Sequence, residues 1–203
     1  MGMRHLVRCL PLAAAAALYA QAPNRIDNEQ VRVGIGVEQP HRRGPMHEHQ
    51  YNRVQIYLTD GVTTLTKPDG KVQRVEYKAG DVRWSPADGP HQSENITDNA
   101  VRIVEIDLKG KPQPHKASDL DPLKTDSKHY KLEFENEQVR VLRIRFGPNE
   151  KGVPHEHTMN RVVVYLNDQS RGKAGEFRLE TPAAHTEENP LDRAVERIAI
   201  DIK

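Results

Sequence analysis

The sequence predicts an all-β protein built from two copies of one small barrel module. Three observations lead to this prediction: short segments rich in β-branched residues, many turn-forming residues between them, and an internal repeat. The chain of 203 residues contains thirteen Gly and fourteen Pro. Beyond residue 22, no long stretch shows the 3.6-residue apolar period of an amphipathic helix. Turn residues at this density suit many short strands better than a helical bundle.

Six segments carry the clearest strand pattern, each short and bounded by turn residues. They are Val31–Val37, Val54–Leu58, Val101–Leu108, Val139–Phe146, Val162–Leu166 and Ile198–Ile202. Aromatic residues make up only 5% of the chain, so Val, Ile and Leu must supply most of the core.

An internal repeat divides the chain into two modules. The hexapeptide at 28–33 recurs identically at 136–141, which is 108 residues later, and further along the separation of matching segments falls to 94. The second copy is therefore about fourteen residues shorter, and the missing piece corresponds to a hairpin around 63–77. We predict a first barrel over 23–109, a polar linker over 110–131 and a shortened second barrel over 132–203.

Residues 1–22 have the pattern of a secretory signal peptide. Arg4 and Arg8 precede an apolar run that is too short to span a bilayer, and Ala20-Gln21-Ala22 matches the small-residue cleavage pattern. An Ala-rich helix of a cytoplasmic protein is the alternative. We expect a periplasmic or secreted protein with no membrane attachment after cleavage. The net charge is +1 without any basic stripe, so we expect no nucleic-acid partner.

The histidines are concentrated at repeated positions. Six of them fall at three matching places in the two copies: His47, His49 and His91, then His155, His157 and His185. In a strand, alternate residues share a face, so the two histidines of each His-x-His pair project together. A third histidine from a neighbouring strand would complete a site for a divalent metal ion (Fe, Mn, Zn, Ni or Cu) with coordination positions left open.

These residues resemble the two motifs of the cupin superfamily, in a tandem (bicupin) arrangement. The first motif is matched by His47-Glu48-His49 with Gly61 downstream, and by His155-Glu156-His157. The second is matched by Gly80, Pro86, His91 and Asn95, and in a degenerate form by Gly175, Pro182, His185 and Asn189. The resemblance implies two double-stranded β-helix, or jelly-roll, barrels and a metal-dependent dioxygenase or isomerase that acts on a small organic molecule.

Both copies depart from the family at the glutamate ligand, which should fall at 53 or 54 and at 161 or 162. The sequence has Arg53-Val54 and Arg161-Val162 instead. Three interpretations follow: a site of three histidines alone, an arginine that binds a carboxylate-bearing ligand, or a site that has lost its metal and binds an anion. Strict alternation places Arg53 on the histidine face, whereas a bulge would place Val54 there.

The candidate substrate-binding residues are Arg53, Arg161, Gln55 and Tyr57, although core packing is the alternative role for Tyr57. No catalytic base is identified. A non-catalytic module that binds a small molecule or anion is the second functional hypothesis, and a scaffold is the third. Val54, Ile56 and Leu58 lie on the face opposite the histidines, and the second copy repeats this pattern at 162–166. Such apolar faces predict packing between barrels, either within the chain or in a homo-oligomer.

Overall fold

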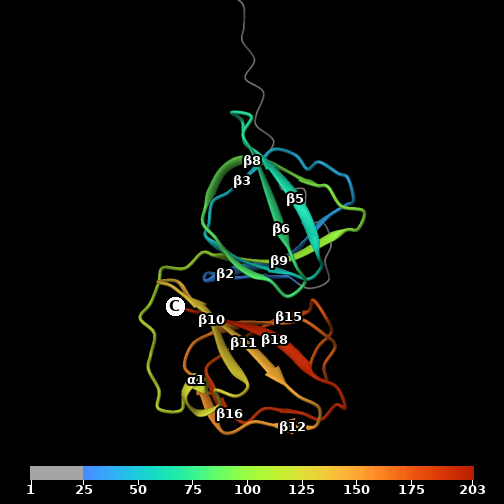
Figure 1. Cartoon of the computed structure of the whole chain (residues 1–203). Coiled ribbons are helices and arrows are strands. Elements are labelled where there is room, and N and C mark those ends of the chain that lie inside the picture. The colour runs from blue at the N-terminus through green and yellow to red at the C-terminus, as the bar shows by residue number, and fades with distance from the viewer. Residues whose placement is uncertain (1–24) are drawn as a thin grey trace, which may run out of the picture.

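The structure is a computed structural model that describes residues 25–203. Strands dominate it, and its two halves form two barrels that lie against each other (Figure 1). The predicted signal peptide lies outside the described residues. Among the residues that are described, no helix is long and apolar enough to cross a membrane.

The first barrel consists of two sheets that face each other. Its strands are β1 (Ile26–Asp27), β2 (Val31–Glu38), β3 (His47–His49), β4 (Arg53–Tyr57), β5 (Gly61–Thr66), β6 (Val72–Tyr77), β7 (Val82–Ser85), β8 (Asp88–Asn95) and β9 (Val101–Leu108). One sheet has the order β1-β2-β9-β4-β7 and the other β3-β8-β5-β6, with antiparallel pairing throughout.

The second barrel repeats the larger sheet in the same register. Its strands are β10 (Tyr130–Glu135), β11 (Val139–Phe146), β12 (Glu150–Lys151), β13 (His155–His157), β14 (Arg161–Tyr165), β15 (Phe177–Glu180), β16 (Ala183–His185), β17 (Glu188–Asn189) and β18 (Val195–Ile202). The order β10-β11-β18-β14-β15 matches that of the first barrel, and the central pairing of β11 with β18 follows that of β2 with β9. The other side has only the pairs β12-β17 and β13-β16.

The second barrel lacks the hairpin that β5 and β6 form in the first. A turn around Gly70, whose φ is 81°, closes that hairpin, whereas residues 166–176 connect β14 directly to a sheet-edge strand, β15. The two-barrel architecture and the shortened second copy predicted from the repeat are thereby confirmed.

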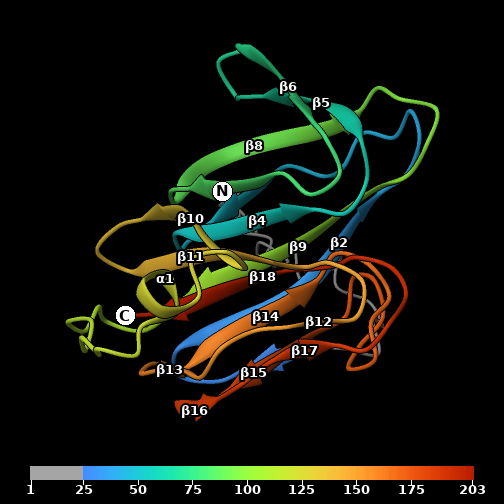
Figure 2. The same ribbon diagram turned by 60° about the horizontal axis from the view of Figure 1, so that its bottom comes forward.

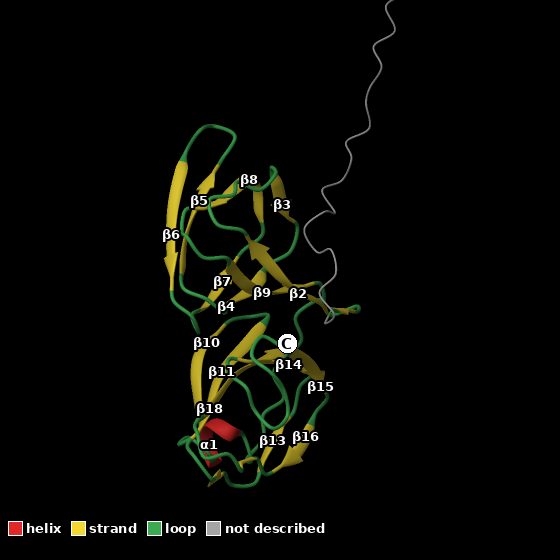
Figure 3. Ribbon diagram, turned by 90° about the vertical axis from the view of Figure 1, so that its right-hand side faces the viewer, coloured by secondary structure: helices red, strands yellow, loops and turns green. Residues whose placement is uncertain are grey.

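The end of the linker packs against the second barrel. The short helix α1 (Pro122–Thr125) lies beside that barrel (Figure 3). The amide of Glu156 in β13 donates to the carbonyl of Leu120 at 2.8 Å, and the hydroxyl of Ser118 donates to the Glu156 carboxylate at 2.6 Å. The linker thus covers the free edge of β13, which would otherwise present unpaired backbone groups. Strand β10 begins at Tyr130, slightly before the expected start of the module at 132.

The two larger sheets pack face to face and form a shared apolar core (Figure 2). It contains the side chains that the sequence places opposite the histidines, among them Val54 and Ile56 from one barrel and Val162 and Val164 from the other. All four are fully buried. The prediction of barrel-to-barrel packing is confirmed within the chain. An oligomer would have to use another face, because these side chains have no exposed surface left to bury.

Reciprocal hydrogen bonds at the edge of this core reflect the repeat. Asn52 donates through Nδ2 to Oε1 of Gln138 at 2.6 Å, and Asn160 donates to Oε1 of Gln30 at 2.8 Å. Each bond joins the same two repeat positions with the copies exchanged. The arrangement is therefore close to a two-fold relation, and the two histidine trios face away from the shared core.

Candidate metal centres

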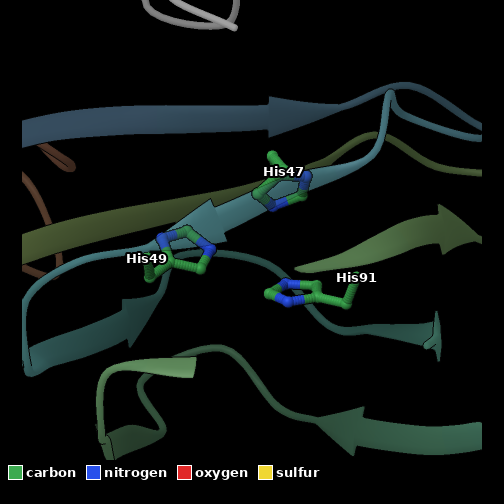
Figure 4. A group of neighbouring side chains, drawn as sticks. All are labelled: His47, His49 and His91. Atoms are coloured by element: carbon green, nitrogen blue, oxygen red, sulfur yellow. The ribbon is translucent and has the colours of Figure 1, made fainter. Parts of the chain in front are cut away.

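In the first barrel, two strands bring the three predicted histidines together. His47 and His49 lie on β3, and His91 lies on β8, directly opposite His47 in the antiparallel pairing. One ring nitrogen from each residue lies within 4.8 Å of the others. Figure 4 shows the three rings turned toward a common point. The ring centroids are 4.6–5.2 Å apart.

Backbone carbonyls fix the tautomer of two of these imidazoles. Nδ1 of His47 lies 3.0 Å from the carbonyl oxygen of Pro45, and Nδ1 of His91 lies 3.0 Å from that of Gly89. A carbonyl oxygen can only accept, so each Nδ1 must carry the proton, which leaves the Nε2 lone pair free. Hydrogen bonds of this kind orient histidine ligands in metal sites.

The electrostatics of the first trio favour neutral imidazoles. Burial lowers the pKa of His49 to about 4, and the positive charge of Arg53 adds to this effect. Burial also lowers the pKa of His91. Neutral imidazole is the form that binds metal ions, so at neutral pH the site is ready to accept a cation.

The second trio has the same geometry, with its His-x-His pair more deeply buried than that of the first. His155 and His157 on β13 meet His185 on β16, with ligand atoms again within 4.8 Å of one another. Nδ1 of His155 donates to the carbonyl of Val153 at 2.9 Å. His155 is 0% exposed and His157 2%, whereas His47 and His49 keep part of their surface accessible. Burial lowers the pKa of His157 to about 2, again assisted by a neighbouring arginine, Arg161.

The donor set fits a divalent metal ion in both barrels. Three neutral nitrogens per barrel converge, and in the second barrel Nδ1 of His157 and Nε2 of His185 are buried without a hydrogen-bond partner among the described residues. Buried polar nitrogens without partners are costly unless a ligand satisfies them.

The arginines that replace the family glutamate point to the histidine side of each barrel, as strict alternation predicts. Arg53 in β4 is 5% exposed, and its Nε lies 3.4 Å from a carboxylate oxygen of Glu105. Nε and Nη1 of Arg53 find no hydrogen-bond partner in residues 25–203. Arg161 in β14 is 3% exposed and pairs with Glu180 at 2.5 Å, while its Nη1 lacks a hydrogen-bond partner within the same range. Buried guanidinium groups of this kind are suited to bind a carboxylate.

The other two candidate substrate contacts differ in character. Gln55 donates through Nε2 to Glu105 at 3.1 Å, so it belongs to the polar group around Arg53. Tyr57 stacks on Tyr77 with ring centroids 4.0 Å apart and packs into a small buried cluster inside the barrel. Its hydroxyl donates to Gln55 at 3.4 Å. The structure therefore gives Tyr57 a packing role and places Gln55 where a ligand of Arg53 would be. Substrate binding by either residue remains a prediction.

Three further residues near the trios were not identified from the sequence. Glu105, on β9, lies beside Arg53, and its negative charge raises the pKa of His49 against the larger effect of burial. In the second barrel, the hydroxyl of Tyr130 lies 2.9 Å from Nε2 of His155 and donates to Oε2 of Glu187 at 2.5 Å. Glu187 also forms an ion pair with Arg197. Burial raises the pKa of Glu187, but Arg197 and the Tyr130 hydroxyl outweigh burial and bring it to about 2. A signal existed for Glu187, because it lies two residues after His185 and alternation puts both on one face.

Fold and site together define a double-barrel protein of the cupin fold with two candidate metal centres. Residues 35–107 match the Cupin_2 family, described as a cupin domain. The comparison with curated proteins gave no match. The family match covers the first barrel and supports a resemblance of that barrel to the cupin superfamily.

Solved structures similar to this chain share the fold at low sequence identity. AerE from Microcystis aeruginosa has a TM-score of 0.63 and 11% identity, with 92% of this chain and 96% of that one covered. Oxalate decarboxylase from Bacillus subtilis, studied for its Mn(II) centres, gives 0.58 and 12%, covering 87% and 70%. A cupin 2 conserved barrel domain protein from Leptotrichia buccalis gives 0.52 and 14%, covering 88% and 87%.

Proposed function

We propose that the protein is an exported, metal-dependent enzyme that acts on a small organic carboxylate in its first barrel. The observation that carries this proposal is the buried guanidinium of Arg53 beside three convergent histidines, with Nε and Nη1 that form no hydrogen bond to any described residue. The histidines would hold the metal ion, and Arg53 would donate charge-assisted hydrogen bonds to the carboxylate of the substrate. When bound, a metal ion supplies Lewis acidity or activates dioxygen.

The charge balance of the first barrel favours an anionic substrate. A divalent ion and Arg53 would together carry three positive charges. Of the carboxylates nearby, Asp107 and Asp88 are paired with Arg32 and Lys67, which leaves Glu105 to offset one of the three, so the site stays positive. Gln55 donates to the same carboxylate oxygen of Glu105 that lies 3.4 Å from Nε of Arg53. The partial exposure of His47 and His49 supports access from solvent.

The reaction class that this site favours is that of a dioxygenase or an isomerase. Both need a metal with open coordination positions next to a bound organic anion. Fe, Mn, Zn, Ni and Cu all accept three imidazoles. The name of one structural neighbour, oxalate decarboxylase with its Mn(II) centres, agrees with a metal beside a carboxylate substrate.

A non-catalytic module that captures a small anion is the second candidate. The replacement of the ligand glutamate by arginine in both copies favours it, since an arginine and three imidazoles bind anions without a metal. The two candidates differ in whether ligand binding requires the metal.

Calorimetric titration of small mono- and dicarboxylates into metal-free and metal-loaded protein separates them. The enzyme proposal expects binding in the presence of Fe²⁺ or Mn²⁺ and consumption of dioxygen or conversion of the ligand. Equal binding by the metal-free protein, without turnover by any of the five metals, would support the anion-binding module and overturn the enzyme.

Export is tested separately. Fractionation of expressing bacterial cells, followed by N-terminal sequencing, should find the mature chain outside the cytoplasm and beginning near residue 21 or 23. A cytoplasmic chain that keeps residues 1–22 would contradict this part of the proposal.

A further inference from the structure

The hydroxyl of Tyr130 joins the histidine trio of the second barrel. It lies 2.9 Å from Nε2 of His155, and its ring centroid is 4.8 Å from that of His155 and 5.9 Å from that of His157. The first ring separation falls within the 4.7–5.3 Å range between the three imidazoles themselves, and the second is longer. Tyr130 therefore stands as a fourth member of the cluster.

The distance between the hydroxyl and the imidazole matches that between two ligands of one ion. Because Nδ1 of His155 donates to a carbonyl, its Nε2 offers a lone pair. Metal–nitrogen and metal–oxygen bonds of about 2.0–2.2 Å place two neighbouring ligand atoms roughly 3 Å apart. The oxygen of Tyr130 is therefore near enough to Nε2 of His155 to share a metal ion with it.

We propose that Tyr130 is the fourth protein ligand of the second barrel, so that this barrel holds its metal ion in a closed site. This inference rests on the proposed metal binding of the trio. On coordination, the O–H bond of Tyr130 breaks and an oxygen–metal bond forms. The proton leaves through Glu187, the present acceptor of that hydroxyl, to solvent, and no oxidant or reductant is needed. Tyrosine serves as an iron ligand in other proteins.

Glu187 and Arg197 hold the tyrosine oxygen in place. Oε2 of Glu187 receives both the Tyr130 hydroxyl and the Arg197 guanidinium, while its Oε1 lies 3.6 Å from Nε2 of His185. The Glu187 side chain is 9% exposed. Such contacts around a ligand fix its orientation and strengthen metal binding.

The closed arrangement belongs to the second copy alone. The repeat places Ala22, Ser93 and Ile103 at the positions of the first copy that correspond to Tyr130, Glu187 and Arg197. The first copy therefore has no tyrosine, carboxylate or guanidinium at these three positions. Conversely, Ala199 stands where the first copy has Glu105. We infer a division of roles, with an open metal centre in the first barrel and a closed one in the second.

Ferric iron tests this directly, because an iron(III)–phenolate pair absorbs visible light and an iron(III)–imidazole set does not show that band. A variant with His47→Ala and His91→Ala keeps only the second centre. Loaded with Fe²⁺ under anaerobic conditions and oxidised with ferricyanide, it should develop the visible band and the phenolate vibrations in resonance Raman spectra. The variant with His155→Ala and His185→Ala, which keeps only the first centre, should not.

Tyr130→Phe in the second-centre variant should bind iron but lose the band. Tyr165→Phe is the matched control, since Tyr165 is buried in the same apolar cluster as Tyr130 and has its ring beside Arg178. It should keep the band. Bound iron without the band, or a band that survives Tyr130→Phe, would overturn the inference and leave the proposed function intact. Failure of the first centre to bind metal would instead remove the proposed function, whatever the second barrel shows.

Discussion

Replacing Arg53 by glutamine should weaken carboxylate binding to the metal-loaded first barrel by roughly 100-fold or more. The guanidinium is buried, and Nε and Nη1 lack hydrogen-bond partners among the described residues, so an anionic ligand would receive a charge-assisted bond from each. Each such bond contributes about 1.5–3 kcal/mol. A loss of about 3 kcal/mol corresponds to roughly two powers of ten in affinity.

The assay is calorimetric titration of the best-binding carboxylate into protein loaded with one metal. Arg53→Lys, which keeps the charge but loses the two-pronged geometry, should fall between the wild type and Arg53→Gln. Arg42→Gln, at an exposed position, serves as the matched control and should bind as the wild type does. Arg161→Gln should leave affinity within about twofold if the first barrel alone binds substrate. A change of less than tenfold for Arg53→Gln, in protein that unfolds normally in urea, would refute the reasoning.

Three further predictions concern stability and pH. Ile106→Ala, in the core between the barrels, should lower the free energy of unfolding by about 2–5 kcal/mol in urea titrations, and a loss below about 1 kcal/mol would argue against the shared core. Arg140→Ala, which leaves the buried carboxylates of Asp121 and Asp201 without their common partner, should cost about 3–5 kcal/mol by the same measurement; stability equal to the wild type would contradict the ion-pair assignment. The metal-free protein should lose stability as the pH falls from about 6.5 to about 4. In this range His49 takes up a proton in the unfolded chain but stays neutral in the folded state, because folding lowers its pKa to about 4. Urea midpoints across this range test that sign, and a rise in stability toward pH 4 would contradict it.

The repeat and the histidine spacing predicted the main architecture and both trios. An identical hexapeptide at 28–33 and 136–141 fixes equivalent strands, and the two-residue spacing within each His-x-His pair fixes a common face. Strict alternation also predicted that Arg53 turns toward the histidines. These features follow from local backbone geometry, which a sequence encodes directly.

The site residues that the sequence did not reveal reach the histidines through contacts between strands that are far apart in the chain. Tyr130 belongs to the end of the linker, and only the pairing of β10 with β11 brings it to a histidine 25 residues further on. Likewise, alternation showed that Val54 and Ile56 form an apolar face but not what covers it. In the structure, the other barrel of the same chain covers that face.

Metal analysis of the purified mature protein tests the central claim most directly. We predict one divalent ion per barrel by mass spectrometry. His47→Ala should remove only the ion of the first barrel, and His155→Ala only the ion of the second. Protein that holds no ion after exposure to Fe, Mn, Zn, Ni or Cu, or that keeps both ions in these variants, would contradict it.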